Sequence, residues 1–316
     1  MSNLFSKFKV CLQLNQKRLK TSGLQKPSWI PFSKAKFGEF IQQKPSLNNA
    51  FTDDGFVQRL IRHYLPKNVL TEVTPDLTRF GERIVSEIED IGRQCELQQP
   101  KLYFDDGWGK VETRLWTSSA WKKQKEISAE EGLVAIAYER NFREFSRIYQ
   151  LMKLYLYIPS SGLYSCPLAM TDGAAKTIED LQLNESFYKN AYTRLTSRDP
   201  NLFWTSGQWM TEKGGGSDVA RGTETLAIPE GDKTFRLYGY KWFSSATDSD
   251  VTLTLARISD LEGNVLSGTR GLTLFFLKTR ENDKLNNIQI VKLKDKLGTR
   301  QLPTAELLLD GTLAYK

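Results

Sequence analysis

Hydrophobic residues recur every three to four positions from about residue 46 to residue 200, and this spacing predicts helices. One such segment follows Thr74 and Pro75 and runs on to Ile91. Threonine is a favourable N-cap, and proline is tolerated in the first turn, where its missing N–H has no intrahelical partner to lose. We therefore predict a helix that begins at Pro75.

A second helical segment follows Ser128 and Glu131, whose spacing is that of a capping box. It runs to about Pro159 and is apolar on more than one face, which predicts a helix buried between neighbours. Two shorter helices are predicted, one after Cys166–Pro167 and one over Glu185–Leu195.

The pattern changes after Pro200, where short alternating stretches rich in β-branched and aromatic residues are separated by turn residues. The candidate strands are Thr223–Ile228, Thr234–Phe243, Val251–Ile258, Gly271–Thr279, Ile288–Lys294 and Ala305–Leu309. Their regular spacing predicts an antiparallel sandwich or barrel. The predicted fold class is α+β multidomain, with a leader over 1–45, an all-α helical domain over 46–200 and a β-domain over 201–316.

The net charge of +7 is concentrated in the leader. Residues 1–38 contain no acidic residue and eight basic ones: Lys7, Lys9, Lys17, Arg18, Lys20, Lys26, Lys34 and Lys36. The chain has 44 basic and 37 acidic residues. Residues 39–316, the body of the chain, contain 36 of the basic and all 37 of the acidic residues, so the body is nearly neutral. A neutral body argues against a nucleic-acid partner. The basic, amphipathic leader is typical of a mitochondrial transit peptide; the alternative is a disordered basic arm on a cytoplasmic protein.

The remaining composition excludes several classes of site. The three cysteines have no metal-ligand spacing and are odd in number, which indicates a reducing compartment and predicts no metal site. No apolar run approaches the ~18 residues of a membrane span. His63, the sole histidine, lies beside Arg62 in a predicted helix, which is typical of a packed or surface residue.

Candidate chemistry lies in the stretch Met210–Val219, which reads MTEKGGGSDV. Three consecutive glycines allow the backbone to come close to a ligand, and their N–H groups can face an anion such as a pyrophosphate. A glycine triplet alone is as well explained by a flexible turn. About twenty residues later, a predicted strand ends in Lys241-Trp242-Phe243-Ser244.

These two motifs, in this order and spacing, resemble the flavin-binding pattern of the acyl-CoA dehydrogenase middle domain. The stretch Lys294–Arg300, which reads KDKLGTR, resembles the closing motif of the same β-domain. Ser165–Thr171, which reads SCPLAMT, resembles a segment of the adaptive-response (AidB-like) branch of the family. The resemblance covers roughly residues 50 to 316.

The resemblance implies FAD as cofactor and a fatty acyl-CoA as substrate. It assigns cofactor binding to Met210, Thr211, Glu212, Gly214, Gly215, Gly216, Ser217, Asp218, Val219, Trp242, Phe243 and Ser244. Within this set, Thr211 would hydrogen-bond the flavin ring, and Ser217 would lie between the FAD phosphates and the bound acyl-CoA. Trp242 would pack on the flavin face or, alternatively, be a core aromatic residue. Ser244 would place a hydroxyl near flavin N5. Arg300 is expected to pair with a surface carboxylate.

The resemblance also implies a reaction for which no base is recognised in this chain. In the family, a carboxylate removes the α-proton of the thioester while the β-hydrogen leaves as hydride to flavin N5. That base belongs to a C-terminal helical domain which also builds the oligomer. The chain ends at Lys316, which predicts a truncated or alternatively spliced product, an incomplete gene model or a naturally short chain that needs a partner. We expect exposed apolar surface and name no catalytic residue.

Three alternatives to a dehydrogenase remain open. The chain could hold acyl-CoA or flavin without turnover, which the missing base favours. It could be a DNA-associated flavoprotein of the adaptive-response branch, which its neutral body disfavours. An acyl-CoA oxidase would differ in letting oxygen reach the reduced flavin. Acyl chain length and electron acceptor are not indicated by the residues.

Overall fold

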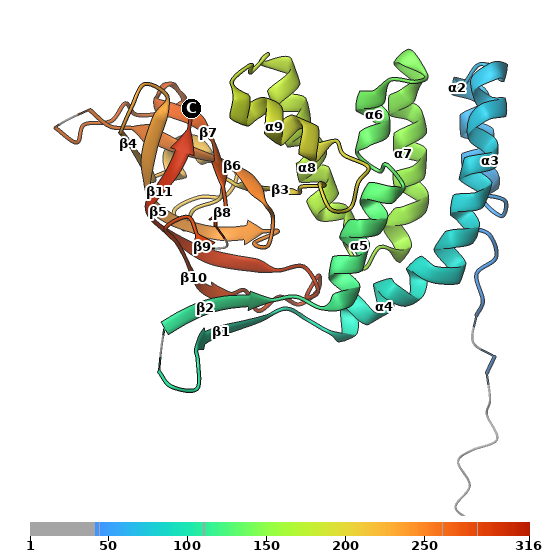
Figure 1. The fold of residues 1–316 in the computed structure, drawn as a ribbon, viewed down its shortest axis with the longest axis horizontal. Helices are drawn as coiled ribbons and strands as arrows, with labels where there is room; N and C mark the ends of the chain where they lie inside the picture. Colours follow the sequence, from blue (N-terminus) through green and yellow to red (C-terminus); the bar gives the residue numbers. More distant parts are fainter. Residues whose placement is uncertain (1–41, 44, 110, 261, 283) are drawn as a thin grey trace, which may run out of the picture. The chain divides into compact units, whose positions relative to one another are not determined.

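The computed structural model describes residues 42–43, 45–109, 111–260, 262–282 and 284–316. The chain divides into two units, Met1–Ser46 and Leu47–Lys316. The basic segment that we interpret as a leader lies almost wholly outside the described residues. In the second unit, helices come first along the chain and a β-rich region follows (Figure 1). Among the described residues, no helix is long and apolar enough to cross a membrane.

The helical region runs from Gly55 to Leu195. Its elements are α2 (Gly55–Tyr64), α3 (Lys67–Arg83), the π-helical turn η2 (Ile84–Ile88), α4 (Glu89–Leu97), α5 (Ser119–Glu130), α6 (Ala135–Glu139), the 3-10 turn η3 (Arg143–Phe145), α7 (Ser146–Tyr157), the 3-10 turn η4 (Ile158–Ser160), α8 (Ser165–Asp180) and α9 (Ser186–Leu195). The predicted helices after Cys166–Pro167 and over Glu185–Leu195 correspond to α8 and α9.

The predicted helix start at Pro75 is wrong. Helix α3 begins at Lys67, directly after Pro66 as N-cap, and continues through Pro75. Val69, Val73 and Leu77 are buried at helical spacing on both sides of the proline. This continuous apolar face is packed into the core, so tertiary packing outweighs the backbone hydrogen bond that the proline cannot make.

The predicted capping box at Ser128 is also wrong. Ser128 lies inside α5, whose N-cap is Ser118, and Glu131 is the residue that ends this helix. The expected long helix up to Pro159 is instead divided between α6 and α7, because Arg140 adopts a left-handed conformation with φ of 53°. The apolar pattern does extend over both helices, which is why periodicity alone did not show the break.

A β-hairpin interrupts the region that was predicted to be all-helical. Strands β1 (Lys101–Asp105) and β2 (Val111–Trp116) pair antiparallel between α4 and α5. Leu102 and Leu115 pack against the core of the β-rich region, and the hairpin lies alongside β10 (Figure 1). The hairpin therefore connects the two regions of the unit.

The β-rich region contains β3 (Ser206–Trp209), the short helix α10 (Val219–Gly222), β4 (Leu226–Pro229), β5 (Thr234–Ser245), β6 (Val251–Ile258), the 3-10 turn η5 (Thr269–Gly271), β7 (Leu272–Lys278), β8 (Arg280–Glu281), β9 (Lys284–Leu285), β10 (Ile288–Leu293) and β11 (Thr304–Tyr315). All six predicted strands are present, with shifted bounds, and β11 is much longer than predicted. The prediction missed β3 and the two-residue strands β8 and β9.

Five strands close into a ring in the order β11–β5–β4–β6–β7, and β7 returns to β11 through the pairing of Phe276 with Tyr315. The prediction of a barrel is therefore met, but its purely antiparallel character is not: β6 runs parallel to both β3 and β4. Strands β4 and β5 form a hairpin, and β6 then pairs with the far side of β4. Alternation along a strand does not reveal which neighbour it takes.

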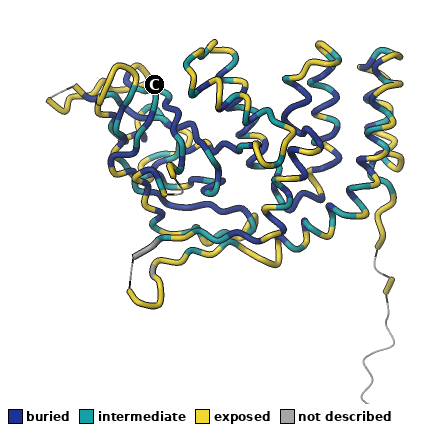
Figure 2. The backbone as a smooth tube through the Cα atoms, in the orientation of Figure 1, coloured by how far each residue is buried: buried dark blue, intermediate teal, exposed yellow. Residues whose placement is uncertain are grey.

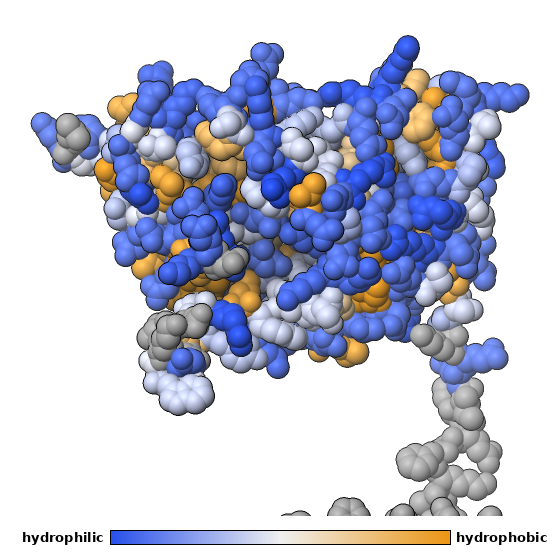
Figure 3. Space-filling model, viewed as in Figure 1, coloured by the Kyte–Doolittle hydropathy of each residue, from blue (hydrophilic) through white to orange (hydrophobic). Residues whose placement is uncertain are grey.

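Buried positions follow the strands of the ring and the inward faces of the helices, and exposed ones gather in the turns (Figure 2). Helix α8 joins the two regions, since the backbone N–H of Ser206 in β3 donates to Thr171 Oγ1 at 3.0 Å. Apolar side chains are exposed on α2 and α7, where the rings of Phe56 and Tyr155 lie 6.5 Å apart. On the face drawn in Figure 3, hydrophobic surface is divided into separate areas by hydrophilic side chains.

Candidate functional site

The glycine motif forms a turn followed by the short helix α10. Glu212 and Gly215 form a β-bridge, and the N–H of Gly215 donates to the Glu212 carbonyl at 3.2 Å. Gly214, Gly216 and Ser217 are exposed. Asp218, the N-cap of α10, accepts a hydrogen bond from the N–H of Arg221 at 3.2 Å. The turn thus presents backbone and a hydroxyl to solvent, as an anion-binding loop would.

The two motifs that are distant in sequence are joined directly in the structure. The backbone N–H of Trp242 donates to the Thr211 carbonyl at 2.9 Å, and Glu212 forms a β-bridge with Lys241. The segment that leads into the glycine turn therefore extends the sheet beside β5. This contact could be suspected from the family resemblance, but it does not follow from either motif alone.

The glycines of this loop and of α10 differ in their surroundings. A Cβ atom at Gly216 would meet nothing within 4 Å, so this backbone is open to a ligand. A Cβ at Gly222 in α10 would lie 2.7 Å from the Cα of Gly215. Gly215 and Gly222 are therefore needed for packing within the loop, whereas Gly216 offers the open backbone expected of a cofactor cradle.

Trp242 is half-buried, and two lysines lie near its ring. The Lys294 Nζ is 3.2 Å from the centroid of its ring, and the Lys213 Nζ is 5.4 Å from it. Lys294 belongs to the KDKLGTR stretch, which this contact brings to the site. The neighbouring Phe243 is exposed. Arg300 contacts Asp295 at 3.7 Å, and Asp295 is almost fully exposed, so the expected surface pairing of Arg300 is confirmed.

Glu306 on β11 holds Lys294 in this position. It accepts hydrogen bonds from Lys294 at 2.8 Å and from the Tyr240 hydroxyl at 2.5 Å. Burial raises the pKa of Glu306, but the bonds from Lys294, Tyr240 and Lys292 outweigh it and lower the pKa to about 2. The carboxylate is therefore charged at neutral pH, and its oxygens are occupied by these three partners.

The end of β5 carries two hydroxyls on different sides. Ser244 is fully buried, and its Oγ has no hydrogen-bond partner within the described residues. Ser245 is half-buried, and its Oγ lies 3.0 Å from Thr304 Oγ1, to which Lys296 Nζ also donates at 2.9 Å. The role of Ser244 beside a flavin stays a prediction. Ser245, Thr304 and Lys296 were not singled out from the sequence.

Comparisons with known proteins show which proteins this chain is similar to. Residues 207–312 match the model of the acyl-CoA dehydrogenase middle domain. Acyl-CoA dehydrogenase family member 11 of Caenorhabditis elegans is 54% identical over 289 residues, which cover 90% of this chain and 47% of that protein. The Escherichia coli AidB protein is 28% identical over 250 residues, which cover 76% and 44%. The chain belongs to the acyl-CoA dehydrogenase family.

Solved structures of relatives support the same family fold. The crystal structure of Caenorhabditis elegans ACDH-11 in complex with C11-CoA has a TM-score of 0.87 at 54% identity and covers 89% of this chain and 48% of that one. The apo form of Bd2924 has a TM-score of 0.82 at 46% identity, with 87% and 55% covered. The chain spans about half the length of the curated relatives it matches.

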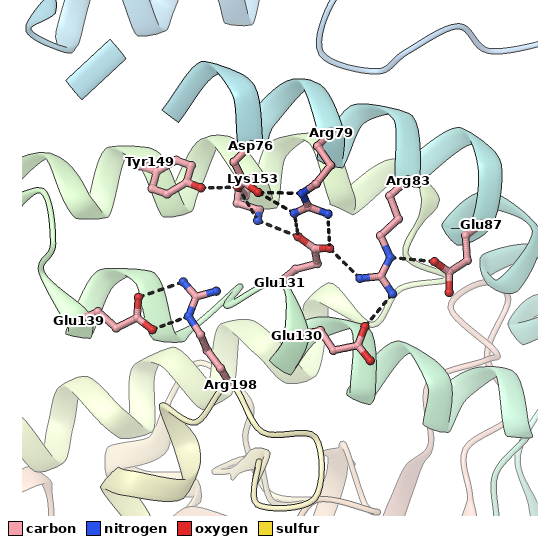
Figure 4. Close-up of polar contacts among 10 residues, drawn as sticks. All are labelled: Asp76, Arg79, Arg83, Glu87, Glu130, Glu131, Glu139, Tyr149, Lys153 and Arg198. Atoms are coloured by element: carbon pink, nitrogen blue, oxygen red, sulfur yellow. Dashed lines mark hydrogen bonds and ion pairs between the residues drawn. The ribbon is translucent and has the colours of Figure 1, made fainter. Parts of the chain in front are cut away.

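This acyl-CoA dehydrogenase family chain also has a buried charge cluster in its helical region (Figure 4). Lys153 on α7 donates to both Asp76 and Glu131 at 2.8 Å, and its side chain is 2% exposed. Arg79 and Arg83 complete the partners of Glu131. Every carboxylate here is paired, so the cluster connects α3, the end of α5 and α7 and offers no free base.

An open groove of about 490 Å³ lies beside α10 in this family member. Arg257, almost fully buried in its wall, donates to the main-chain carbonyls of Thr223, Leu266, Gly268 and Ala220. The arginine thereby ties the end of α10 to the loop before η5. Within the described residues, no group of three or more side chains could hold a metal ion.

Proposed function

We propose that this chain is the FAD-holding part of a fatty acyl-CoA dehydrogenase. The direct junction between the glycine turn and β5, made by Trp242 and Thr211, carries this proposal. It brings an open glycine backbone, a half-buried tryptophan and hydroxyls into one place. The relative of known structure at 54% identity, crystallised with C11-CoA, supports a fatty acyl-CoA as the substrate.

The residues present fit a flavin dinucleotide. The open backbone at Gly216 and the hydroxyl of Ser217 suit the pyrophosphate, and Thr211 and Trp242 suit the ring system. Ser244 has a hydroxyl without a partner among the described residues, but it is fully buried, so this arrangement does not expose it to a cofactor and its place near flavin N5 stays a prediction. When bound, FAD would accept the hydride that leaves the β-carbon of the acyl-CoA thioester.

The contribution of the chain itself is binding and orientation. The Lys294–Glu306 pair holds the Trp242 ring from one side, and the glycine turn fixes where an anion can sit. Ser217 is exposed at the end of the turn and would contact both cofactor and substrate. A base for the α-proton is not assigned to any residue here.

A second candidate is an acyl-CoA or flavin binding protein without turnover. The observation that favours it is the state of the buried carboxylates in the β-rich region. Glu212 is paired with Lys241 at 2.7 Å, and Glu306 is paired with Lys294 at 2.8 Å. Neither is available to take a proton from a substrate. Membership of the AidB-like branch, a homo-oligomeric form and mitochondrial import stay predictions.

The test is the visible absorption spectrum of the purified chain with FAD, before and after anaerobic addition of a medium- to long-chain acyl-CoA. Flavin absorbance that bleaches on addition supports the dehydrogenase half-reaction. Bound flavin that changes spectrally without bleaching supports the binding protein. A chain that retains no flavin after incubation with FAD contradicts the dehydrogenase and the flavin-binding form of the second candidate.

A further inference from the structure

The glycine loop comprises residues 213–223, between Glu212 and Glu224. The Glu212 carboxylate connects the two ends of this loop. The Glu212 carboxylate accepts a hydrogen bond from the backbone N–H of Glu224 at 2.7 Å. It also accepts one from the Thr225 hydroxyl at 2.5 Å. The residue before the loop thus holds the first residues after it, so loop residues 213–223 are tied together at their base.

A buried lysine ties this base to β5. The Lys241 Nζ donates to Glu212 Oε1 at 2.7 Å and to the carbonyl of Leu255 on β6 at 2.8 Å. Lys241 is fully buried, and Glu212 is 5% exposed. The residue after Lys241 is Trp242, so the same strand end carries both the ion pair and the ring of the candidate site.

Glu212 cannot contact a ligand in this arrangement. Both carboxylate oxygens are occupied by protein donors, and almost none of the side chain reaches solvent. Buried ions are tolerated when each has its counter-ion and hydrogen bonds, and removing one partner leaves the other uncompensated. The direct cofactor contact that the family resemblance assigned to Glu212 therefore does not match its surroundings.

Besides its base, the second half of the loop is held by the buried Arg257, which donates to the carbonyls of Ala220 and Thr223, whereas the first half has few other constraints. Gly214, Gly216, Ser217 and Asp218 are exposed, and the close contacts inside the loop are those of Gly215 with Gly222 and the cap at Asp218. The position of the first half of the loop relative to Trp242 thus depends on how the base is held.

We propose that Glu212 and Lys241 form a positioning pair, which presets the glycine loop against Trp242 before FAD binds. This inference rests on the proposed function for its ligand. Glu212 acts through the backbone of the loop rather than by touching the cofactor. Loss of the pair is expected to leave the loop mobile, so that binding must order it again.

The test compares two double variants that both remove the buried charges. Glu212→Gln with Lys241→Met keeps one of the two acceptor oxygens at the loop base, whereas Glu212→Ala with Lys241→Met keeps none. We expect the alanine double variant to bind FAD about tenfold more weakly than the glutamine one, because the loop is no longer held in its binding shape. Flavin fluorescence titration gives the affinities, well below each melting temperature.

Amide hydrogen exchange without cofactor is the second measurement. We expect faster exchange in residues 213–223 of the alanine double variant, with little change elsewhere in the β-rich region. Thr225→Val, which removes one bond at the loop base and no charge, is expected to show a smaller effect in the same peptide and serves if the double variants fail to fold. Glu230→Gln, at the half-exposed pair with Arg236, is the matched control.

Wild-type affinity together with wild-type exchange in residues 213–223 of the alanine double variant and of Thr225→Val would overturn the positioning role. Uniformly faster exchange with unchanged FAD affinity would do the same, because it indicates a general stabilising pair. If the unaltered chain does not bind FAD, the proposed function fails. The exchange comparison then still decides whether the pair holds the loop.

Discussion

Lys294 lies against the indole of Trp242, with its Nζ 3.2 Å from the ring centroid, and Glu306 fixes it there through a 2.8 Å ion pair. Lys294 and Trp242 come from motifs about fifty residues apart. Their contact orients an aromatic ring that is half-buried at the end of β5. A cation held this close to an indole contributes about 1 kcal/mol or more where water is partly excluded.

Replacing Lys294 with methionine is expected to release the Trp242 ring and to weaken FAD binding about fivefold, in keeping with the loss of about 1 kcal/mol. Flavin fluorescence titration measures the effect. Lys292→Met is the matched control, because Lys292 also contacts Glu306, at 3.2 Å, but is 61% exposed. Equal affinities for the two variants would show that the cation–ring contact does not orient the site.

The Lys153→Met variant is expected to lose about 3 kcal/mol of unfolding free energy, since it leaves Asp76 and Glu131 without their buried cation. The arginines that remain on Glu131 keep the loss near the lower end of the usual range. Urea denaturation gives the value. Lys176→Met, which breaks exposed pairs on α8, should change it by less than about 1 kcal/mol; a similar loss in both variants would contradict the assignment.

The same cluster predicts sensitivity to acid. Burial raises the pKa values of Asp76 and Glu131, but their bonds to Lys153, Arg79 and, for Glu131, Arg83 lower both to about 2, from 3.8 and 4.5. Because the folded-state values are depressed, this stabilisation is fully present above about pH 4.5. It is lost as the pH falls towards 2, by about 2 kcal/mol for each carboxyl. Urea midpoints between pH 6 and pH 2.5 measure it, and in Lys153→Met the decline should be shallower.

Two glycine substitutions separate packing from ligand approach in the loop. Gly216→Ala should fold with nearly unchanged stability, because its Cβ meets no atom within 4 Å. It should nevertheless weaken FAD binding about tenfold if the cofactor lies against this backbone. Gly222→Ala should disturb the loop itself, since its Cβ would be 2.7 Å from Gly215. Thermal melting and FAD titration together give the comparison; full affinity in Gly216→Ala would place the cofactor elsewhere.

Much of the architecture follows from local pattern. The change from helical spacing to alternation near Pro200 is real. The predicted strands Val251–Ile258 and Thr234–Phe243 correspond to β6 and β5, because alternating apolar residues have to face one side of a sheet. The glycine motif and the Lys241–Ser244 stretch could be matched to a family because few sequences combine them. The side chains of Asp54 and Ser118 cap α2 and α5. Local pattern predicted Thr74 and Ser128 as caps instead, because each precedes an apolar run of helical spacing.

Tertiary structure decided what local pattern cannot express. Pro75 lies inside a helix because buried residues on either side keep that face packed, and β6 runs parallel to β4 because it pairs with the far edge of a hairpin. Glu212 was assigned to cofactor binding from its motif, yet Lys241, 29 positions away, pairs with it in the core. Sequence determines which residues could carry charge, hydroxyls or an open backbone. Which of them face a ligand depends on partners that are distant along the chain, because burial and pairing are properties of the folded neighbourhood.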